Sequence, residues 1–360
     1  MKHKIAVIGS HSALDVCRGA KEEGFKTLVV TQKGRSKTYS KYYKTQNGVG
    51  CVDECLELEK FSEILDVKVQ KKLKSKNVIF IPHRSFEVYL NFDYDSIENL
   101  KFPIFGNKYM LRIEERGKRP NQYDLLEKAN ILYPKQFKDP KKIDRLCIVK
   151  VLEKERGFER AFFLVKSYKD FIKESKRRIK NKSFTKKQLG EAVIEEFVLG
   201  VQVNFNFFYS PISKRLELLG TDTRRQTNLE GITKTPASYQ EEILKVVPIK
   251  YEEAGHIAVT VLESLLEDAF SAGERFVKAS QELFPPGIIG PFALQAVVTP
   301  GPPKKEIVVI DVSPRVPGSP GIFATPYSGY LYGKSLSVGR RIAMEIKEAE
   351  MKNLLKRIIT

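Results

Sequence analysis

The chain has 360 residues, 42% of them apolar and 29% charged, which is enough for two or three domains with buried cores. No apolar run approaches the ~20 residues of a membrane helix, and residues 5–8 are too short a run for a signal peptide, so we expect a cytoplasmic protein without membrane contact. The formal net charge of +18 would attract phosphorylated ligands. Because no recognition motif or aromatic stacking platform accompanies the basic runs, we expect no nucleic-acid partner.

The first hundred residues alternate short apolar strands with helical stretches. Strands are predicted at residues 4–9, 26–31 and 77–81, and helices at residues 12–23 and near 59–74. This alternation predicts an α/β domain with a doubly wound parallel sheet over residues 1–106. Cys51 and Cys55 form no CxxC pair and are interpreted as ordinary loop or helix cysteines.

Polar segments follow the first and third predicted strands, and ligands of such sheets bind beyond the carboxyl ends of the strands. The first segment reads GSHS (residues 9–12) and the other PHRS (residues 82–85). A dinucleotide needs more glycines, whereas a single ribonucleotide phosphate can sit at a helix N-terminus. Helix capping explains Ser10 and Ser12 equally well, but it does not explain His11 at the tip of the turn.

The next segment predicts a small strand-rich lobe over residues 107–190, which includes two preceding helices within 107–133. Its strands are CIVKV (147–151) and RAFFLVK (160–166). Lys150 ends the first strand, where a lysine can either extend to solvent or reach a phosphate.

A large antiparallel lobe is predicted over residues 191–360, with two hairpins and a closing helix from about residue 335. Its first strand ends in Glu195 and Glu196, followed by apolar residues and a glycine. The backbone of such a segment can bind the edge of an adenine while a glutamate binds the ribose hydroxyls. Alternatively, the two glutamates can simply be exposed to solvent at the end of a strand.

The last hairpin carries two polar residues on one face. If Val298 pairs with Glu306, Gln295 lies opposite Val309 and diagonal to Asp311. An amide carbonyl and a carboxylate are hard oxygen ligands that suit a magnesium ion with phosphate. The pattern fits equally well a polar pair that meets water.

In this order the segments are similar to the ATP-grasp superfamily, in which ATP lies between a small strand-rich lobe and a large antiparallel lobe. More closely, the chain resembles the archaeal formate-dependent ligases that formylate AICAR (5-aminoimidazole-4-carboxamide ribonucleotide), the FAICAR synthetase or PurP family. The likeness runs from end to end. It is carried by GSHSALDVCRGAKEEGF, IPHRSF, PIFGNKYMLRIEER, VIEEFVLG, DTRRQTN and VIDVSPRV.

The resemblance implies that ATP, with Mg²⁺ or Mn²⁺, activates formate as formyl phosphate, which the AICAR amine attacks to give FAICAR in purine (IMP) biosynthesis. It also implies a homo-oligomer. The implied substrate-binding residues are His11, Ser85 and Asn228, and the implied metal ligands are Gln295 and Asp311. The implied ATP-binding residues are Lys108, Lys150, Glu195, Glu196 and Val198, and Arg315 is the implied catalytic residue that faces the phosphates.

Three departures from the family pattern keep two alternatives open. The glycine-rich loop of the small lobe reads VLEKERGFER (151–160) here, Arg225 and Gln226 replace a Tyr-Glu pair, and prolines follow the metal strand. The first alternative is a divergent ATP-grasp paralogue that ligates another small carboxylate to a phosphorylated amine. The second is a non-catalytic nucleotide-binding paralogue.

Overall fold

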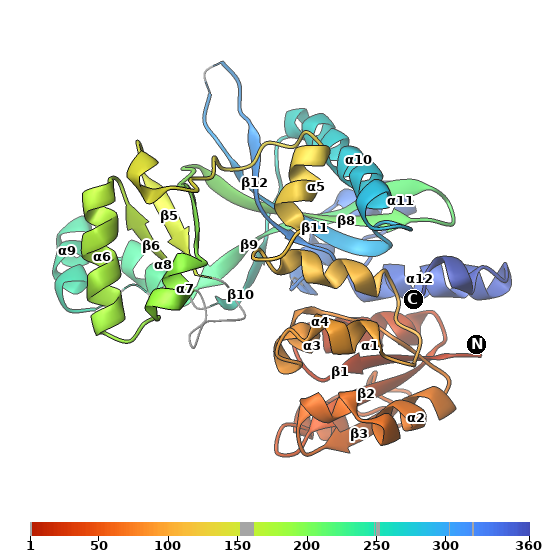
Figure 1. Cartoon of the computed structure of the whole chain (residues 1–360). Helices are drawn as coiled ribbons and strands as arrows, with labels where there is room; N and C mark the ends of the chain where they lie inside the picture. Colours follow the sequence, from red (N-terminus) through yellow and green to blue (C-terminus); the bar gives the residue numbers. More distant parts are fainter. Residues whose placement is uncertain (1, 152–161, 248, 250–252, 302, 319) are drawn as a thin grey trace.

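The computed structural model describes residues 2–151, 162–247, 249, 253–301, 303–318 and 320–360, which form three sheets (Figure 1). A parallel sheet has the strand order β3-β2-β1-β4, and two antiparallel sheets have the orders β6-β5-β7 and β10-β9-β8-β11-β12. The predicted fold class is confirmed: an α/β N-terminal domain precedes a small and a large antiparallel lobe. No described helix is long and apolar enough to cross a membrane.

The N-terminal domain contains one strand that the sequence analysis missed. Cys55 lies in β3, which pairs in parallel with β2, so its interpretation as a loop or helix residue is wrong. Leu56 and Leu58 are buried, whereas the intervening Glu57 is exposed. The acidic residues of this segment lower its strand propensity and hide the alternation. The elements are β1 (Lys4–Ile8), α1 (Ala13–Glu22), β2 (Lys26–Gln32), β3 (Glu54–Leu58), α2 (Val67–Ser75), β4 (Val78–Phe80), α3 (Arg84–Tyr89) and α4 (Tyr94–Glu98).

Two segments lie across the expected domain boundaries. The strand β7 pairs with β5 in the small sheet, although the expected boundary at residue 191 assigns it to the large lobe. The helices before the small lobe bury Met110, Ile113 and Leu125 in the core of the large lobe. The elements concerned are η3 (Lys108–Glu114), α5 (Gln122–Lys128), β5 (Cys147–Lys150), β6 (Phe162–Val165), α6 (Tyr168–Lys180), α7 (Lys186–Gly190) and β7 (Val193–Glu196).

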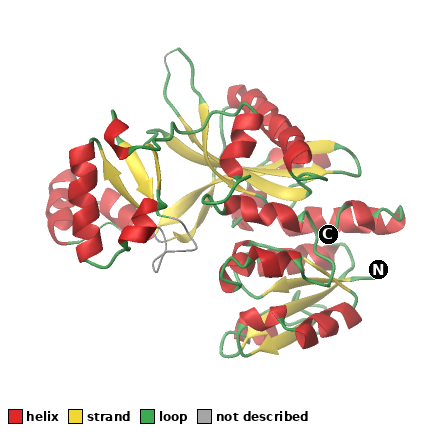
Figure 2. Cartoon of the chain, viewed as in Figure 1, coloured by secondary structure: helices red, strands yellow, loops and turns green. Residues whose placement is uncertain are grey.

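The large lobe is built around β11, which is buried along its whole length between β8 and β12. The helix α10 packs Phe276 against Phe292 of this strand, and Figure 2 shows helices lying over the sheet. The elements are β8 (Val201–Ser210), β9 (Arg215–Gln226), α8 (Thr227–Thr233), α9 (Ala237–Val246), β10 (Glu253–Ala258), α10 (Leu266–Leu283), β11 (Gly290–Val298), β12 (Ile307–Ser313), α11 (Tyr327–Tyr332) and α12 (Val338–Met351).

The last residues of the chain complete the N-terminal domain. The helix α12 packs on α1, and Ile342 and Ile346 share one core cluster with Val16. Thr360 and Ile104 exchange two backbone hydrogen bonds of 2.9 and 3.0 Å. The N-terminal domain and the large lobe are therefore joined by a common core and by backbone pairing.

The contact between α1 and α12 leaves no room for a side chain at its centre. A Cβ atom on Gly339 would lie 2.3 Å from the carbonyl oxygen of Asp15. We expect Gly339→Ala to lower the free energy of unfolding by about 1–3 kcal/mol, because the two helix backbones must move apart. Urea denaturation measures this change.

The matched control is Gly231→Ala in α8, where no atom lies within 4 Å of the new methyl group. That variant should keep or slightly raise the stability, because alanine favours a helix by up to ~1 kcal/mol over glycine. Equal losses in the two variants would contradict the proposed crowding.

Candidate active site

A pocket of about 440 Å³ lies where the small sheet faces the large sheet. Apolar side chains such as Ile148, Leu164 and Leu199 form part of its wall, and charged side chains line it on both the small-sheet and the large-sheet side. Six residues predicted from the sequence line this one pocket: Lys150, Glu195, Glu196, Val198, Gln295 and Asp311.

The small-lobe side of the pocket holds a buried ion pair. Lys150 of β5 pairs with Glu195 of β7, and the Tyr123 hydroxyl donates a 3.0 Å hydrogen bond to the same carboxylate. Glu196 is only half-buried and accepts a 3.4 Å bond from Arg145. Glu195 thus holds the lysine side chain in place. Glu196 and Val198, at and just after the end of β7, line the pocket.

Gln295 and Asp311 lie directly opposite each other on β11 and β12. The expected register is wrong by one residue, because Val298 pairs with Ile307. A β-bulge at Ile310 then restores the shared face, so the two side chains meet as expected, although by a different register.

Both side chains are held by arginines. The Asp311 carboxylate accepts a 2.8 Å bond from Arg116, and the Gln295 carbonyl accepts one from Arg224. Burial opposes ionisation of Asp311, but Arg116 and then Lys150 outweigh it and lower its pKa. An ionised carboxylate beside an amide oxygen fits a divalent cation that also takes phosphate oxygens. No group of three or more His, Cys, Asp or Glu residues that could hold a metal ion occurs in the described chain.

A second polar site lies at the carboxyl edge of the parallel sheet. The strand order reverses between β1 and β4, which is the switch point where such sheets bind ligands. His11 follows β1 in a left-handed conformation (φ 51°), and its ring stacks on His83 at 5.8 Å. Ser85 donates a 3.0 Å hydrogen bond to Ser10. The prediction that His11 and Ser85 lie close together at this edge of the sheet is therefore confirmed.

The serines of the GSHS turn do not cap α1. Ser12 occupies the N-cap position without a side-chain cap bond, and its hydroxyl instead donates 2.9 Å to the carbonyl of Pro317. Ser10 faces the hydroxyls of Tyr89 and Ser85. The capping interpretation is wrong for this turn because its serines face the neighbouring segments.

The turn rests on a buried neutral histidine. One ring nitrogen of His83 lies 3.0 Å from the carbonyl of Ile8, and the other accepts a 3.2 Å bond from the amide of Ser85. These partners fix one neutral tautomer. Burial, then the neighbouring His11, lower the pKa of His83 to about 3. Desolvation of its ring and the nearby Arg315 also lower the pKa of His11.

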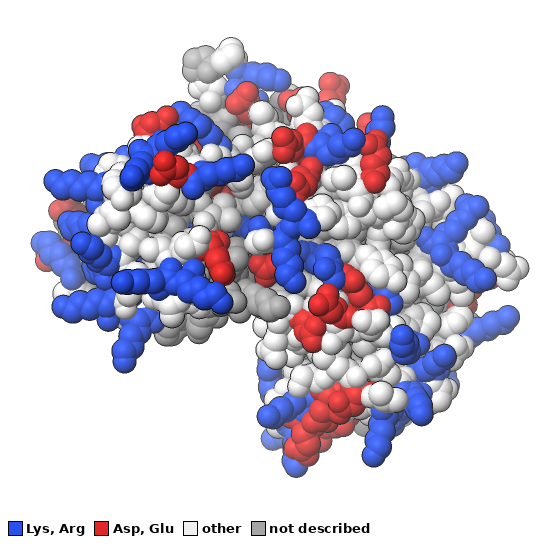
Figure 3. Space-filling model, viewed as in Figure 1, with Lys and Arg blue, Asp and Glu red and all other residues white. Residues whose placement is uncertain are grey.

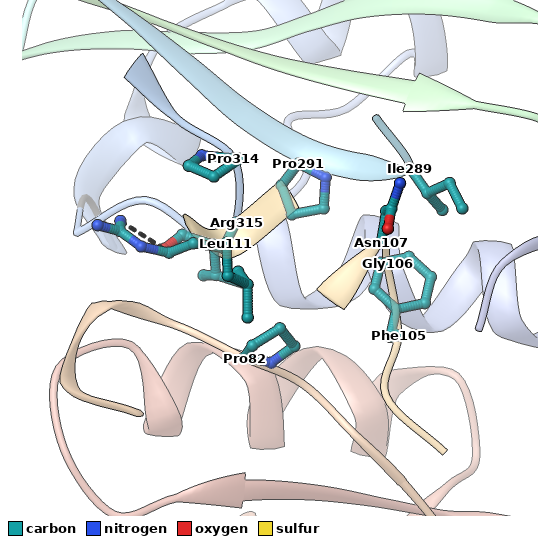
Figure 4. Close-up of a pocket in the computed structure, with 10 residues that line it drawn as sticks. Pro82, Phe105, Gly106, Asn107, Leu111, Ile289, Pro291, Pro314 and Arg315 are labelled. Carbon is teal, nitrogen blue, oxygen red and sulfur yellow. Dashed lines mark hydrogen bonds between the residues drawn. The ribbon is translucent and has the colours of Figure 1, made fainter. Parts of the chain in front are cut away.

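Arg315 lies between the two sites and does not line the pocket. It is buried and pairs with Glu87 at 3.1 Å and Glu114 at 2.9 Å. Figure 4 shows its guanidinium directed away from a cavity of only about 10 Å³, which Pro82 and Pro291 help to line. Two carboxylates therefore hold Arg315 at the junction and outside the pocket lining, and its role facing the phosphates stays a prediction.

Two other predicted residues lie apart from the main groups. The ammonium of Lys108 is 3.4 Å from the carbonyl of Leu100, at the contact with the N-terminal domain and outside the pocket. Asn228 is in the first turn of α8, near Gln226 and Leu229, which line the pocket. The glycine-poor loop lies outside the described residues apart from Val151.

No sequence pattern had pointed to three further residues near the sites: Arg116, Arg224 and the histidine of β10. The two arginines bring positive charge to Asp311 and Gln295, and their roles depend on tertiary contacts. His256 is one of only four histidines, which was the available signal. It lies beside Asp222.

A parallel-sheet domain followed by two antiparallel sheets, with a charged pocket between them, defines the ATP-grasp class of proteins. The chain matches a solved IMP biosynthesis protein, PurP, from Thermococcus kodakaraensis, with 30% identity and a TM-score of 0.70 over 99% of this chain and 100% of the other. The ADP complex of an N5-carboxyaminoimidazole ribonucleotide synthetase shares the fold, at 13% identity, with a TM-score of 0.59 and coverage of 93% and 78%.

Two curated relatives are named 5-formaminoimidazole-4-carboxamide-1-(beta)-D-ribofuranosyl 5'-monophosphate synthetase. They come from Methanopyrus kandleri and Methanocaldococcus jannaschii, are each 36% identical, and are matched over 99% of this chain and 94% of their own length. Family models described as a protein of unknown function (DUF1246) and a domain of unknown function (DUF1297) match residues 5–137 and 170–360. The chain belongs to this synthetase family.

The neutral state of His83 makes the fold sensitive to acid. Its folded pKa is about 3 and its unfolded pKa is about 6.5, so between these values only the unfolded chain binds the proton. We expect protonation of this group to lower the free energy of unfolding by about 4 kcal/mol as the pH drops from about 6.5 to 3. Urea denaturation across this pH range, with wild type and His83→Gln, measures the effect. An equally steep pH dependence in the variant would contradict it.

Proposed function

We propose that the protein is an ATP-dependent carbon–nitrogen ligase that formylates AICAR with formate, giving FAICAR, ADP and phosphate. The observation that carries this proposal is the pair of sites in one chain. The charged pocket between the antiparallel sheets suits ATP, and the His11 turn at the switch point suits a ribonucleotide. ATP-grasp proteins perform several different ligation reactions. Similarity to the FAICAR synthetases over 99% of the chain supports this particular reaction.

The pocket supplies the groups that a nucleotide needs. The segment after β7, with Glu196 and Val198, forms the side suited to the adenosine, and Lys150 provides a point charge for phosphate. Gln295 and Asp311 would hold a divalent ion, which supplies positive charge to the phosphoryl group during transfer. Magnesium rather than manganese is our expectation from the hard oxygen donors.

The switch-point site holds the second substrate. The lowered pKa of His11 keeps its ring neutral at the end of β1, where it can donate or accept a hydrogen bond with a ribonucleotide. Arg315 and its two carboxylates fix the junction between the sites. The shared core of the N-terminal domain and the large lobe therefore sets the distance between amine and activated formate, and positioning is a major part of catalysis here.

The activity is tested directly with purified protein, ATP, magnesium, formate and AICAR. We expect formate-dependent and AICAR-dependent release of ADP, with FAICAR identified by mass spectrometry. Product only with another carboxylate would favour the divergent ligase, and ATP binding without turnover would favour the non-catalytic paralogue. A homo-oligomer stays a prediction, which sedimentation of the same sample tests.

Asp311→Asn should lower kcat at least about 100-fold, because the variant loses the only carboxylate of the proposed metal pair. The neutral amide should also weaken the dependence of activity on magnesium concentration. Steady-state rates across a magnesium titration measure both effects. Unchanged rates and an unchanged magnesium dependence would remove Asp311 from the metal site.

His11→Ala and Lys150→Met should separate the two sites. We expect the first variant to weaken AICAR binding about 10-fold or more and leave ATP binding largely unchanged. The second should weaken ATP binding and leave AICAR binding unchanged. Isothermal titration calorimetry measures the affinity of each variant for AICAR and for ATP. Parallel loss of both ligands in the His11 variant would mean that the turn is not the substrate site.

A further inference from the structure

A row of polar side chains crosses the large sheet from the proposed metal pair to β10. The paired residues are Asp311 on β12, Gln295 on β11, Asn204 on β8 and Asp222 on β9. Directly paired residues of neighbouring antiparallel strands lie on one face, so these side chains form one continuous line. His256 of β10 ends the line, because one of its ring nitrogens is bonded to Asp222.

Asp222 is a buried anchor for this histidine. Its side chain is 1% exposed, and its two oxygens accept bonds of 2.9 Å from Asn204 and 2.6 Å from Asn206 besides the contact with His256. The other ring nitrogen of His256 lies 2.8 Å from Glu253. Burial disfavours the charged imidazole, but Asp222 and Glu253 outweigh this and raise the pKa of His256 to about 9. The histidine is therefore a cation at neutral pH, held between two carboxylates.

Glu253 is the accessible end of this chain of contacts. Its side chain is 24% exposed, and its second oxygen lies 3.4 Å from Arg224, which in turn binds Gln295 of the metal pair. Burial favours its protonated form, but His256 and Arg224 lower the pKa of Glu253, so it is ionised at neutral pH.

The same cluster borders the substrate turn. A Cβ atom on Gly318 would lie 2.3 Å from the ring of His11 and 3.3 Å from the ring of His256, so the backbone at Gly318 lies against both rings. His256, which holds one oxygen of Glu253, therefore lies near His11, and the other oxygen of Glu253 contacts Arg224, which lines the pocket. In the proposed reaction the amine and the activated formate meet between His11 and the pocket.

We propose that Glu253 accepts the proton that the substrate amine loses, and that His256 and Asp222 position its carboxylate for this step. The inference rests on the proposed function. The amine nitrogen forms a bond to the formyl carbon, the bond between that carbon and the phosphate oxygen breaks, and the nitrogen gives up one proton. Glu253 takes the proton and passes it to the departing phosphate, which leaves as hydrogen phosphate. The attacking nitrogen is strongly acidic once it is bonded to carbon, so a carboxylate is a sufficient acceptor.

The test separates formate activation from amine transfer. Hydroxylamine traps formyl phosphate as formohydroxamate and needs no protein base, whereas FAICAR formation needs the proton acceptor. For Glu253→Gln we expect hydroxamate formation within about 3-fold of wild type and FAICAR formation lowered at least about 100-fold. Equal losses in both assays, or no loss of FAICAR formation, would overturn the role of Glu253.

His256→Gln tests the positioning role independently. We expect kcat for FAICAR formation to fall about 10-fold or more while the KM for AICAR changes little, because the acceptor is displaced and the binding groups are kept. A rise in KM with unchanged kcat would overturn the assignment. The matched control is Glu242→Gln on α9, an exposed carboxylate paired with Lys245, which should leave both assays unchanged.

Thermal unfolding of each variant verifies that the fold is kept. The failure of the proposed function has a different signature, because wild type itself would then make no hydroxamate, or make hydroxamate without formylating AICAR. Either result would overturn the inference together with the function on which it rests.

Discussion

The arrangement of reacting groups depends on how β11 pairs with its two neighbours. This strand is buried at every residue, so its register is fixed on both sides by packing and by backbone hydrogen bonds. A bulge at Ile310 places Gln295 opposite Asp311, and pairing with β8 and β9 extends the same row to Asp222. A slip of one residue would turn the row toward the opposite face, and the proposed metal pair and the proposed proton acceptor would lose their common side.

The cations of the pocket already have partners in the protein. Arg116 binds Asp311, Arg224 binds Gln295, and Lys150 pairs with Glu195. Figure 3 shows that Lys and Arg side chains cover much of the outer face of the small lobe, so the high net charge lies largely outside these pairs. Phosphate groups entering the pocket would exchange partners with cations that are held in place, which limits the reorganisation that binding requires.

Strands and hairpins with period-two alternation could be predicted from the sequence, as could the shared face of Gln295 and Asp311. Their role as metal ligands stays a prediction. A local sequence pattern predicts which face of the sheet a side chain lies on, but it does not predict a β-bulge, in which one strand has an extra residue. The predicted register was off by one residue at the turn, where Val298 pairs with Ile307, and the bulge at Ile310 added a second residue, which restored the shared face. The strand β10 is short, lies at the sheet edge and contains Gly255, so it carries little signal. The helix α10 was not predicted, although its ordinary amphipathic stripe is a pattern that the sequence shows. The pairing of Arg315 with Glu87 joins residues 228 apart in sequence, which no local pattern reveals.

The contact between α1 and α12 orders events during synthesis. The first helix emerges from the ribosome long before the last one, and at ordinary rates of translation the interval is tens of seconds. During that time the part of α1 that packs on α12 is uncovered, so the core cluster that Val16 shares with Ile342 and Ile346 is incomplete. The domain that is made first is thus finished last. Until α12 has been made, the core cluster of the N-terminal domain is therefore incompletely packed.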